Sequence, residues 1–124
     1  MSASRTRARF PMSVYGAGEE PDPRFSMANE RTFLAWIRTA LALSAAGVAL
    51  EALELPIAPG LRLGSALVLI FLGLVTPVLS WLGWAATERA LRLGRPLPSA
   101  LLGPVLAVGT ALAAALVLVG LVLE

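Results

Sequence analysis

The polar and apolar positions divide the chain into a polar beginning and three long apolar segments. Residues 63–87 and 96–123 contain no charged side chain, and residues 32–53 contain only Arg38 and Glu51. Each segment reaches the roughly 20 residues that a helix needs to cross a hydrocarbon core of about 30 Å. The polar positions that recur along the helices of a soluble bundle are missing from them. The pattern predicts an all-α integral membrane protein with three transmembrane helices, at about 32–53, 63–87 and 99–123.

Composition agrees with this prediction and narrows the chemistry. Of the 124 residues, 57% are hydrophobic and 15% are charged, whereas about 25% are charged in ordinary soluble domains. The chain has no cysteine and no histidine, so disulfides and thiolate or imidazole catalysis are excluded. Glu30 and Glu88 have no nucleophile or metal-ligand set beside them. We therefore expect a protein that is not an enzyme and that holds no cofactor and no metal.

The basic residues, all arginine, predict the orientation in the membrane. Eight of the ten lie before residue 32 or in the 88–95 loop, one is Arg62, and none follows the third apolar segment. By the positive-inside rule, the N-terminus and the 88–95 loop are cytoplasmic and the C-terminus is outside. Trp36, Trp81 and Trp84 would then lie at the inner interface, where indole rings are enriched. We expect residues 1–24 to form a flexible, Arg-rich tail and residues 25–124 to form the membrane domain.

Small residues recur on one face of the first predicted helix. Such a face lets a second helix approach closely, and close packing is how helices associate in lipid. The face either packs against the protein's own helices or forms an interface with another copy or a partner membrane protein. The third helix has a similar stripe at Gly103, Ala107, Thr110 and Ala114, and the face on the first helix consists of Ala35, Thr39, Ala42, Ala46 and Ala49.

The charged residues near the predicted inner end allow two interpretations. Arg38 lies about 10 Å deeper than Arg31 on nearly the same face, and a charge at that depth usually faces a bundle interior or a wet cavity. In the first interpretation, Glu88 pairs with Arg38, and Glu30 pairs with Arg89 or Arg92. In the second, the four arginines outnumber Glu30 and Glu88, and the surplus charge binds an anion.

The second interpretation points to particular ligands. Arginine suits bidentate recognition of phosphate, and a ring of Arg38 side chains in an oligomer would resemble an anion pore. Anionic lipid headgroups are the competing ligand. Alternatively, the protein is an accessory subunit that stabilises a partner complex. Nucleic acid is not an expected partner, because no aromatic platform accompanies the basic residues. We expect Asn29 to cap the first helix.

Two intact motifs lie at the start of the first predicted helix. Residues 28–32 read ANERT, and residues 34–39 read LAWIRT. The run 22–39 that contains them resembles the signature of the YidH-like family of small bacterial inner-membrane proteins, catalogued as a domain of unknown function. The resemblance implies a three-span protein of the bacterial inner (plasma) membrane. The same domain type is similar to the membrane part of the fungal vacuolar transporter chaperone complex, which makes and translocates polyphosphate. That similarity implies a place on a polyphosphate path for Arg31 and Arg38.

Overall fold

The first two long helices begin where a proline follows an N-capping position. The computed structural model describes residues 9–124, and in it α2 runs Pro23–Ala52 and α3 runs Pro59–Leu93. Proline suits the first helical turn because its missing N–H would have no partner there. The Asp22 carboxylate accepts a hydrogen bond from the backbone N–H of Arg24 at 2.9 Å and so caps α2. α3 ends at Gly94, which has a left-handed φ of 65°.

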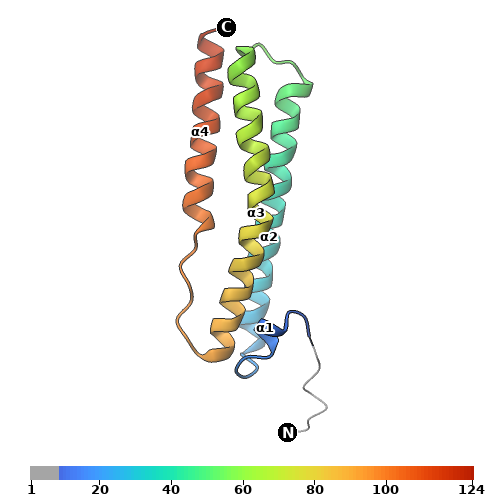
Figure 1. The fold of residues 1–124 in the computed structure, drawn as a ribbon, viewed down its shortest axis with the longest axis vertical. Helices are drawn as coiled ribbons and strands as arrows, with labels where there is room; N and C mark the ends of the chain where they lie inside the picture. Colours follow the sequence, from blue (N-terminus) through green and yellow to red (C-terminus); the bar gives the residue numbers. More distant parts are fainter. Residues whose placement is uncertain (1–8) are drawn as a thin grey trace.

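The three long helices run antiparallel in succession (Figure 1), and the third, α4, spans Leu102–Val122. All three are long and apolar enough to cross a membrane. A fourth, short helix, α1, covers Met12–Tyr15 and lies at the end where α2 begins. No strand occurs among residues 9–124. The predicted all-α architecture with three spanning helices is therefore confirmed.

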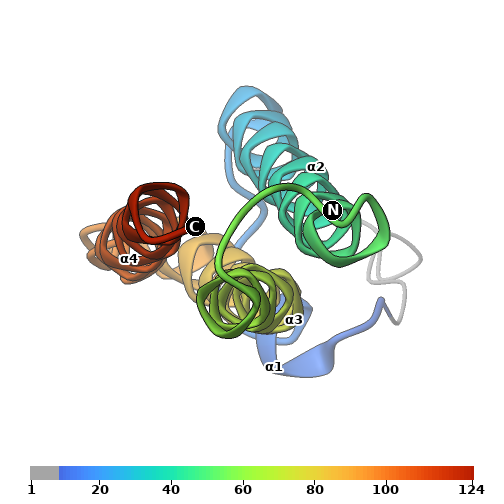
Figure 2. The same ribbon diagram turned by 90° about the horizontal axis from the view of Figure 1, so that it is seen from above.

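α3 is the central helix of the protein. α2 and α4 both pack against α3, and their backbones do not come into contact with each other (Figure 2). A cluster of buried leucines fills the angle between the three helices, with Trp36 packed against it. The cluster consists of Leu43, Leu72, Leu102 and Leu106. Because the backbone of α2 approaches only that of α3 among the long helices, the face of α2 turned away from α3 is left without a partner in the described chain.

Glycine allows α2 and α3 to approach closely. A Cβ atom added at Gly73 would lie 2.1 Å from Ser44 Oγ and 3.0 Å from the Ala40 carbonyl oxygen. A Cβ at Gly47 would lie 2.8 Å from the Ala66 carbonyl oxygen. A Cβ at Gly47 would require movement of a neighbouring backbone, and a Cβ at Gly73 would require movement of the Ser44 hydroxyl. Small residues at a helix contact are the usual means of association in lipid, and here they define the face of α2 that packs inside the protein.

Candidate cationic face and inner-end cluster

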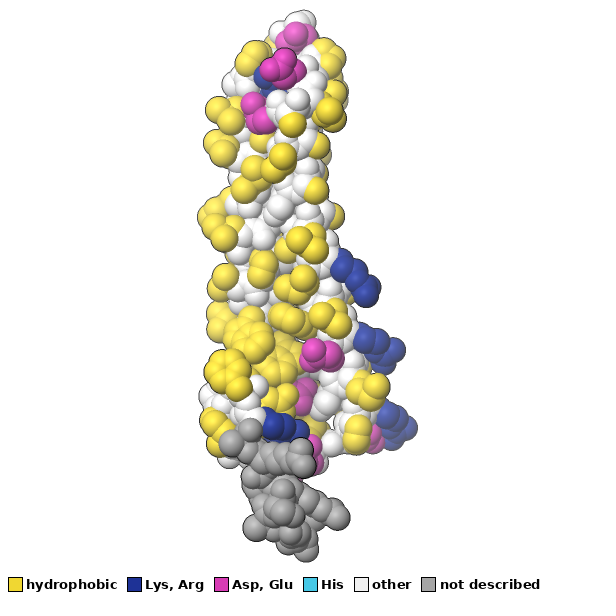
Figure 3. Space-filling model, turned by 90° about the vertical axis from the view of Figure 1, so that its right-hand side faces the viewer, with side chains coloured by type: hydrophobic (Ala, Val, Ile, Leu, Met, Phe, Trp, Pro, Cys, Tyr) yellow, Lys and Arg dark blue, Asp and Glu magenta, His cyan; other side chains and the backbone are white. Residues whose placement is uncertain are grey.

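The outer face of α2 carries a row of arginines. Arg24, Arg31 and Arg38 are spaced by seven residues, which is two turns of helix, so they lie nearly one above another. Figure 3 shows basic side chains at successive heights along one edge of the molecule. All three arginines are exposed. Arg31 and Arg38 make no ion pair and no hydrogen bond with another residue in the range 9–124.

The small residues share this face with the arginines. An alanine stands four residues after each of these arginines, and one more alanine extends this row with the same spacing of seven. The row consists of Ala28, Ala35, Ala42 and Ala49. Ala35 and Ala42 are exposed, and so is Ala46, whereas Thr39 and Ala49 are half-buried. The residues that pack against α3 are instead Ala40, Leu43 and Gly47, which are buried. The interpretation that the alanine face packs within the chain is therefore wrong for Ala35, Ala42 and Ala46.

The stripe on α4 is also turned outward. Gly103, Ala107, Thr110 and Ala114 are exposed, whereas Leu102, Leu106, Ala113 and Gly120 of the same helix are buried. Ala113 lies against α3, and its carbonyl accepts a hydrogen bond from the Ser65 hydroxyl at 3.2 Å. Both stripes predicted from small residues thus lie on surfaces that the described chain leaves uncovered.

Glu88 lies at the C-terminal end of α3, which is the end predicted to face the cytoplasm and is called the inner end, and it does not pair with Arg38. Its carboxylate is 3% exposed and accepts hydrogen bonds from Ser26 Oγ at 2.7 Å and from Asn29 Nδ2 at 3.1 Å. The predicted Glu88–Arg38 pair is wrong because the two side chains differ in both depth and direction. Glu88 lies level with Ser26 and Asn29, on the face of α2 that packs on α3. Arg38 stands nine residues, about 14 Å, further along α2 and on its outer face.

Asn29 connects helices and does not cap one. It lies inside α2, seven residues after the Asp22 cap, and its amide also donates to the Trp84 carbonyl oxygen at 3.1 Å. The prediction that Asn29 caps the first helix is therefore wrong, since the helix begins earlier than the apolar segment. Ser26, Asn29 and Glu88 form a polar contact that fixes the rotation of α2 against α3.

Arg92 is bonded to the residues that precede α2. It is 8% exposed, and its guanidinium donates to the Ala17 carbonyl at 2.7 Å, the Tyr15 carbonyl at 2.9 Å and Glu20 Oε1 at 3.2 Å. The predicted pairing of Glu30 with Arg89 or Arg92 does not form, since Glu30 and Arg89 are exposed and Arg92 is already bonded. Of the four arginines proposed for an anion, Arg31 and Arg38 share a face, Arg89 lies apart on α3, and Arg92 is not available.

The segment 9–22 packs against the inner end of α3. Val14 is 1% exposed, and the Glu19 N–H donates to the Arg92 carbonyl at 3.0 Å. Gly18 has a φ of +55°, and a Cβ there would lie 2.0 Å from the Arg92 carbonyl oxygen. This part of the expected tail is therefore folded onto the membrane domain. Residues 1–8 of that tail, with Arg5 and Arg7, lie outside the described residues.

Aromatic side chains gather where this segment meets α3. Phe10 stacks on Trp81 with ring centroids 6.2 Å apart, Trp81 stacks on Trp84 at 5.0 Å, and Tyr15 lies 6.2 Å from Trp84. Arg9 lies 4.4 Å from the centroid of the Tyr15 ring. Sequence reasoning missed this contact, although two aromatic residues and the turn-forming Gly16 and Gly18 in a tail were a signal for it.

The charged residues at the inner end and those on the outer face of α2 differ in whether protein groups already bind them. Glu88 and Arg92 are satisfied by protein groups, so they hold the inner end together. Arg31 and Arg38 keep their donors free among the described residues, and a guanidinium with free donors can bind an oxyanion in bidentate fashion. No group of acidic side chains in residues 9–124 is placed to hold a metal ion.

Comparison with known proteins places the chain in a protein family. The sequence profile described as "Domain of unknown function (DUF202)" matches residues 24–90, which cover α2 and nearly all of α3. The chain is 48% identical over 88 residues to the inner membrane protein YidH of Escherichia coli (strain K12), covering 70% of this chain and 76% of that protein.

A second relative is an uncharacterized protein of Mycobacterium tuberculosis (strain ATCC 25618 / H37Rv), 53% identical over 81 residues, covering 64% of this chain and 66% of the relative. No solved structure matches the chain. The profile begins at Arg24, so it includes the arginine row, the Asn29–Glu88 contact and the alanine row. With its three spanning helices, the chain is a small multi-pass protein of the inner membrane and belongs to the DUF202 family, with YidH among its relatives.

Proposed function

We propose that this protein is a non-enzymatic homo-oligomer that binds or conducts a phosphate-type anion between the outer faces of its α2 helices. One observation carries the proposal. Arg31 and Arg38 lie on the same uncovered face of a membrane helix as the row of small residues suited to helix association. Such a face can pack closely against another helix, and it brings positive charge to that contact.

The free-energy cost of exposing the arginines of this face to lipid supports the proposal. An arginine at the centre of a spanning helix costs about 2.5–3.5 kcal/mol on insertion scales. Arg31 can extend to the interface, but Arg38 is about 10 Å deeper. Since Arg38 has no partner in residues 9–124, a wet or anion-filled space between copies removes that cost better than lipid does.

The spacing of seven residues supports a particular geometry. Rows that repeat every seven residues favour left-handed crossings of about 20° between neighbouring helices. Closed membrane oligomers have their symmetry axis along the membrane normal, so the same residue of every copy lies at the same depth. The Arg38 side chains would then form one ring and the Arg31 side chains a second, shallower ring.

Repulsion within such rings favours an anionic occupant. Two guanidinium charges about 8 Å apart repel by about 2 kcal/mol at an effective dielectric constant near 20. Phosphate or polyphosphate between them would cancel this repulsion and accept bidentate hydrogen bonds. The similarity of the ANERT and LAWIRT motifs to the polyphosphate-translocating complex supports the same ligand class. We place the arginine-rich end in the cytoplasm by the positive-inside rule.

Binding of tripolyphosphate by the purified protein tests the proposal. Wild type, Arg38→Gln and the matched control Arg95→Gln would be compared by native mass spectrometry from detergent. Arg95 is exposed but lies in the loop after α3. We expect a homo-oligomer that binds the probe, with binding at least tenfold weaker in Arg38→Gln and unchanged in Arg95→Gln. Equal binding by the two variants, or a monomeric wild type, would contradict the proposal.

A second function, accessory subunit of another membrane complex, is favoured by the α4 stripe. Gly103, Ala107 and Ala114 are exposed on a face far from the arginine row, and a partner helix could cover it. In that case, Ala107→Leu would disrupt co-purification of a partner, whereas Arg38→Gln would lower the stability of the protein without changing the binding of an anion. In this role, the arginines would contact anionic lipid headgroups.

A further inference from the structure

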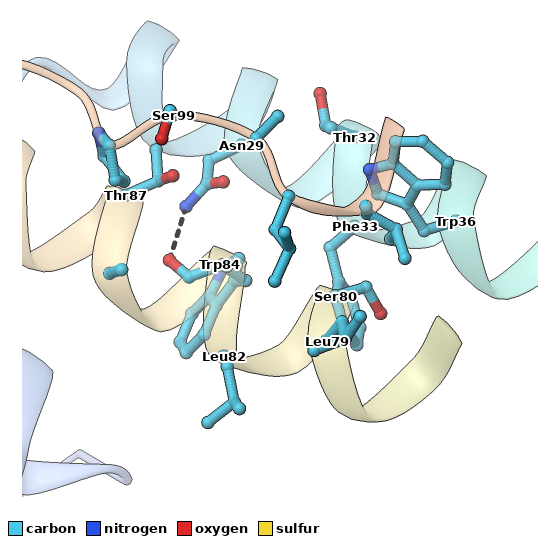
Figure 4. Close-up of a pocket in the computed structure, with 16 residues that line it drawn as sticks. Asn29, Thr32, Phe33, Trp36, Leu79, Ser80, Leu82, Trp84, Thr87 and Ser99 are labelled. Carbon is cyan, nitrogen blue, oxygen red and sulfur yellow. Dashed lines mark hydrogen bonds between the residues drawn. The ribbon is translucent and has the colours of Figure 1, made fainter. Parts of the chain in front are cut away.

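A cavity of about 330 Å³ lies at the inner end of the protein, between α2, α3 and the linker that leads to α4. Figure 4 shows Asn29 and Trp36 reaching it from α2, Thr87 from α3, and Ser99 from the linker. These residues of α2 lie on the face that packs toward α3, opposite the arginine row. The cavity is therefore separate from the proposed anion site.

The cavity wall is uncharged and has two kinds of surface. Apolar and aromatic groups make up most of it, including Phe33, Trp36 and Leu79. Polar side chains are few, and no arginine, aspartate or glutamate is among the lining residues. A charged group placed here would lose hydration without meeting an opposite charge, which is costly. The wall therefore selects an uncharged occupant.

Several polar groups of the wall have spare hydrogen-bonding capacity. Elsewhere in the helices, the hydroxyls of Thr76 and Thr110 donate to the backbone carbonyl four residues earlier, at 2.6 Å in each case. Thr32, Thr87 and Ser99 make no hydrogen bond with another residue of the described chain. The Thr87 and Ser99 side chains lie side by side at the cavity, and neither hydroxyl has a protein acceptor there among residues 9–124 (Figure 4).

Asn29 contributes an acceptor held in a fixed direction. Its Nδ2 is used by the Trp84 carbonyl and by Glu88, so the orientation of the amide is set and Oδ1 is left over. Figure 4 shows the Asn29 amide beside Thr87 and Ser99. The polar part of the cavity can therefore both donate to and accept from one ligand head.

The linker covers the cavity from one side. Residues 95–101 have no helical turns and contain Pro96 and Pro98, which restrict the backbone. Because Thr32, Ser99 and Ala100 of its wall are exposed, the cavity opens to the surface, where a tail attached to a bound head can leave toward the acyl chains. A pocket of this volume, mostly apolar with a few converging polar groups, is typical of small-molecule sites.

We propose that this cavity binds the uncharged, carbonyl-bearing head of a membrane amphiphile. The hydroxyls of Thr87 and Ser99 donate to its carbonyl or ester oxygens, and the Trp36 ring contacts the flat part of the head. Two kinds of amphiphile carry this chemistry: an isoprenoid quinone and a glycerol ester lipid. The site is independent of the anion proposed for Arg31 and Arg38.

Gly83 provides a direct test. It lines the cavity, and a Cβ added there meets nothing within 4 Å, so Gly83→Leu fills the space without a backbone clash. Gly60→Leu is the matched control, because Gly60 lies in the first turn of α3, away from the cavity, and its Cβ is equally free. Decylubiquinone and dioleoylglycerol would serve as separate probes, with binding read by native mass spectrometry and by quenching of tryptophan fluorescence.

We expect saturable binding of at least one probe by the wild type and by Gly60→Leu, and at least tenfold weaker binding by Gly83→Leu. The probe that binds identifies the source of the head. Thr87→Val, which removes a hydroxyl and keeps the shape, should weaken binding severalfold even if Gly83→Leu fails to fold. The proposal is overturned if neither probe binds the wild type saturably, or if the cavity variants bind as well as Gly60→Leu.

Discussion

Asn29 of α2 donates a hydrogen bond to the buried Glu88 carboxylate of α3 across 3.1 Å. Glu88 also accepts from Ser26 at 2.7 Å, so a single carboxylate holds two positions of α2. The contact fixes which face of α2 lies against α3, and thereby which face, the one with Arg31 and Arg38, is left outside. The position of the arginine row thus depends on residues that carry no positive charge.

Removal of the Glu88 carboxylate should destabilise the helix pair. Glu88→Ala leaves the Ser26 and Asn29 donors without their acceptor, at a cost of about 1–3 kcal/mol. We expect a lower midpoint of thermal unfolding in detergent, followed by tryptophan fluorescence, and a smaller decrease for Glu88→Gln. Glu30→Ala is the control because Glu30 is exposed on the same stretch of α2. Equal midpoints for Glu88→Ala and Glu30→Ala would show that the contact is not stabilising.

Arg92 should hold the segment 9–22 on the membrane domain. In Arg92→Ala the carbonyls of Tyr15 and Ala17 and the Glu20 carboxylate lose their shared donor. We expect a glutamate-specific protease to cleave after Glu19 about tenfold faster than in the wild type. Arg92→Lys should give an intermediate rate because lysine lacks the planar fork. If cleavage is as slow as in Arg95→Ala, the Arg92 contacts do not restrain the segment.

The close approach of α2 and α3 at Gly73 should be sensitive to one added methyl group. The new Cβ of Gly73→Ala would lie 2.1 Å from Ser44 Oγ, so we expect destabilisation of about 1–3 kcal/mol by overpacking. Ser44→Ala in the same chain should restore part of this stability by removing the hydroxyl. Gly64→Ala is the control, since its nearest atom, Leu116 Cδ1, is 3.7 Å away. Chemical unfolding in detergent measures all three, and a fully additive double variant would contradict the packing explanation.

The contribution of the Asp22 cap to the stability of α2 should depend on pH only under acidic conditions. Side-chain hydrogen bonds from Arg24, and then its backbone N–H, hold the pKa of the Asp22 carboxyl below its ordinary value of 3.8. A lowered pKa in the folded state means that the cap contributes fully above pH 3.8 and is lost as the pH falls through the lower, folded value. We expect the amide NMR signal of Arg24 to titrate with a midpoint below 3.8 and not to titrate in Asp22→Asn. A midpoint at or above 3.8 would disprove the assignment.

The sequence predicted the helices because their physical signals are local. Apolar runs of sufficient length located α2, α3 and α4, although α2 begins at Pro23 and not near residue 32. Asp22 followed by Pro23 was a recognisable start signal. The family resemblance rested on the run 22–39, whose two intact motifs, at 28–32 and 34–39, lie within the profile match at 24–90.

The contact partner of Glu88 could not be predicted from the sequence, because packing sets both the offset and the rotation of α3 against α2. Glu88 meets Asn29, whereas Arg38 stands about 14 Å further along α2 and on its other side. The position of Arg92 was missed for a different reason, since its partners Tyr15 and Ala17 are backbone carbonyls of a segment read as a tail. Every residue has a backbone carbonyl, so the pattern of side chains does not indicate which carbonyl accepts a hydrogen bond from Arg92.

The account depends most on the claim that the arginine-bearing face of α2 meets the same face of another copy. The chain has no native cysteine, so single cysteines can report this contact by oxidation in native membranes. Ala42 lies on the row with Arg38, whereas Leu41, 68% exposed at the same depth, points about 100° away around the helix. We predict efficient disulfide-linked dimers for Ala42→Cys and few for Leu41→Cys. Equal cross-linking of the two variants, or none at Ala42→Cys, would contradict the account.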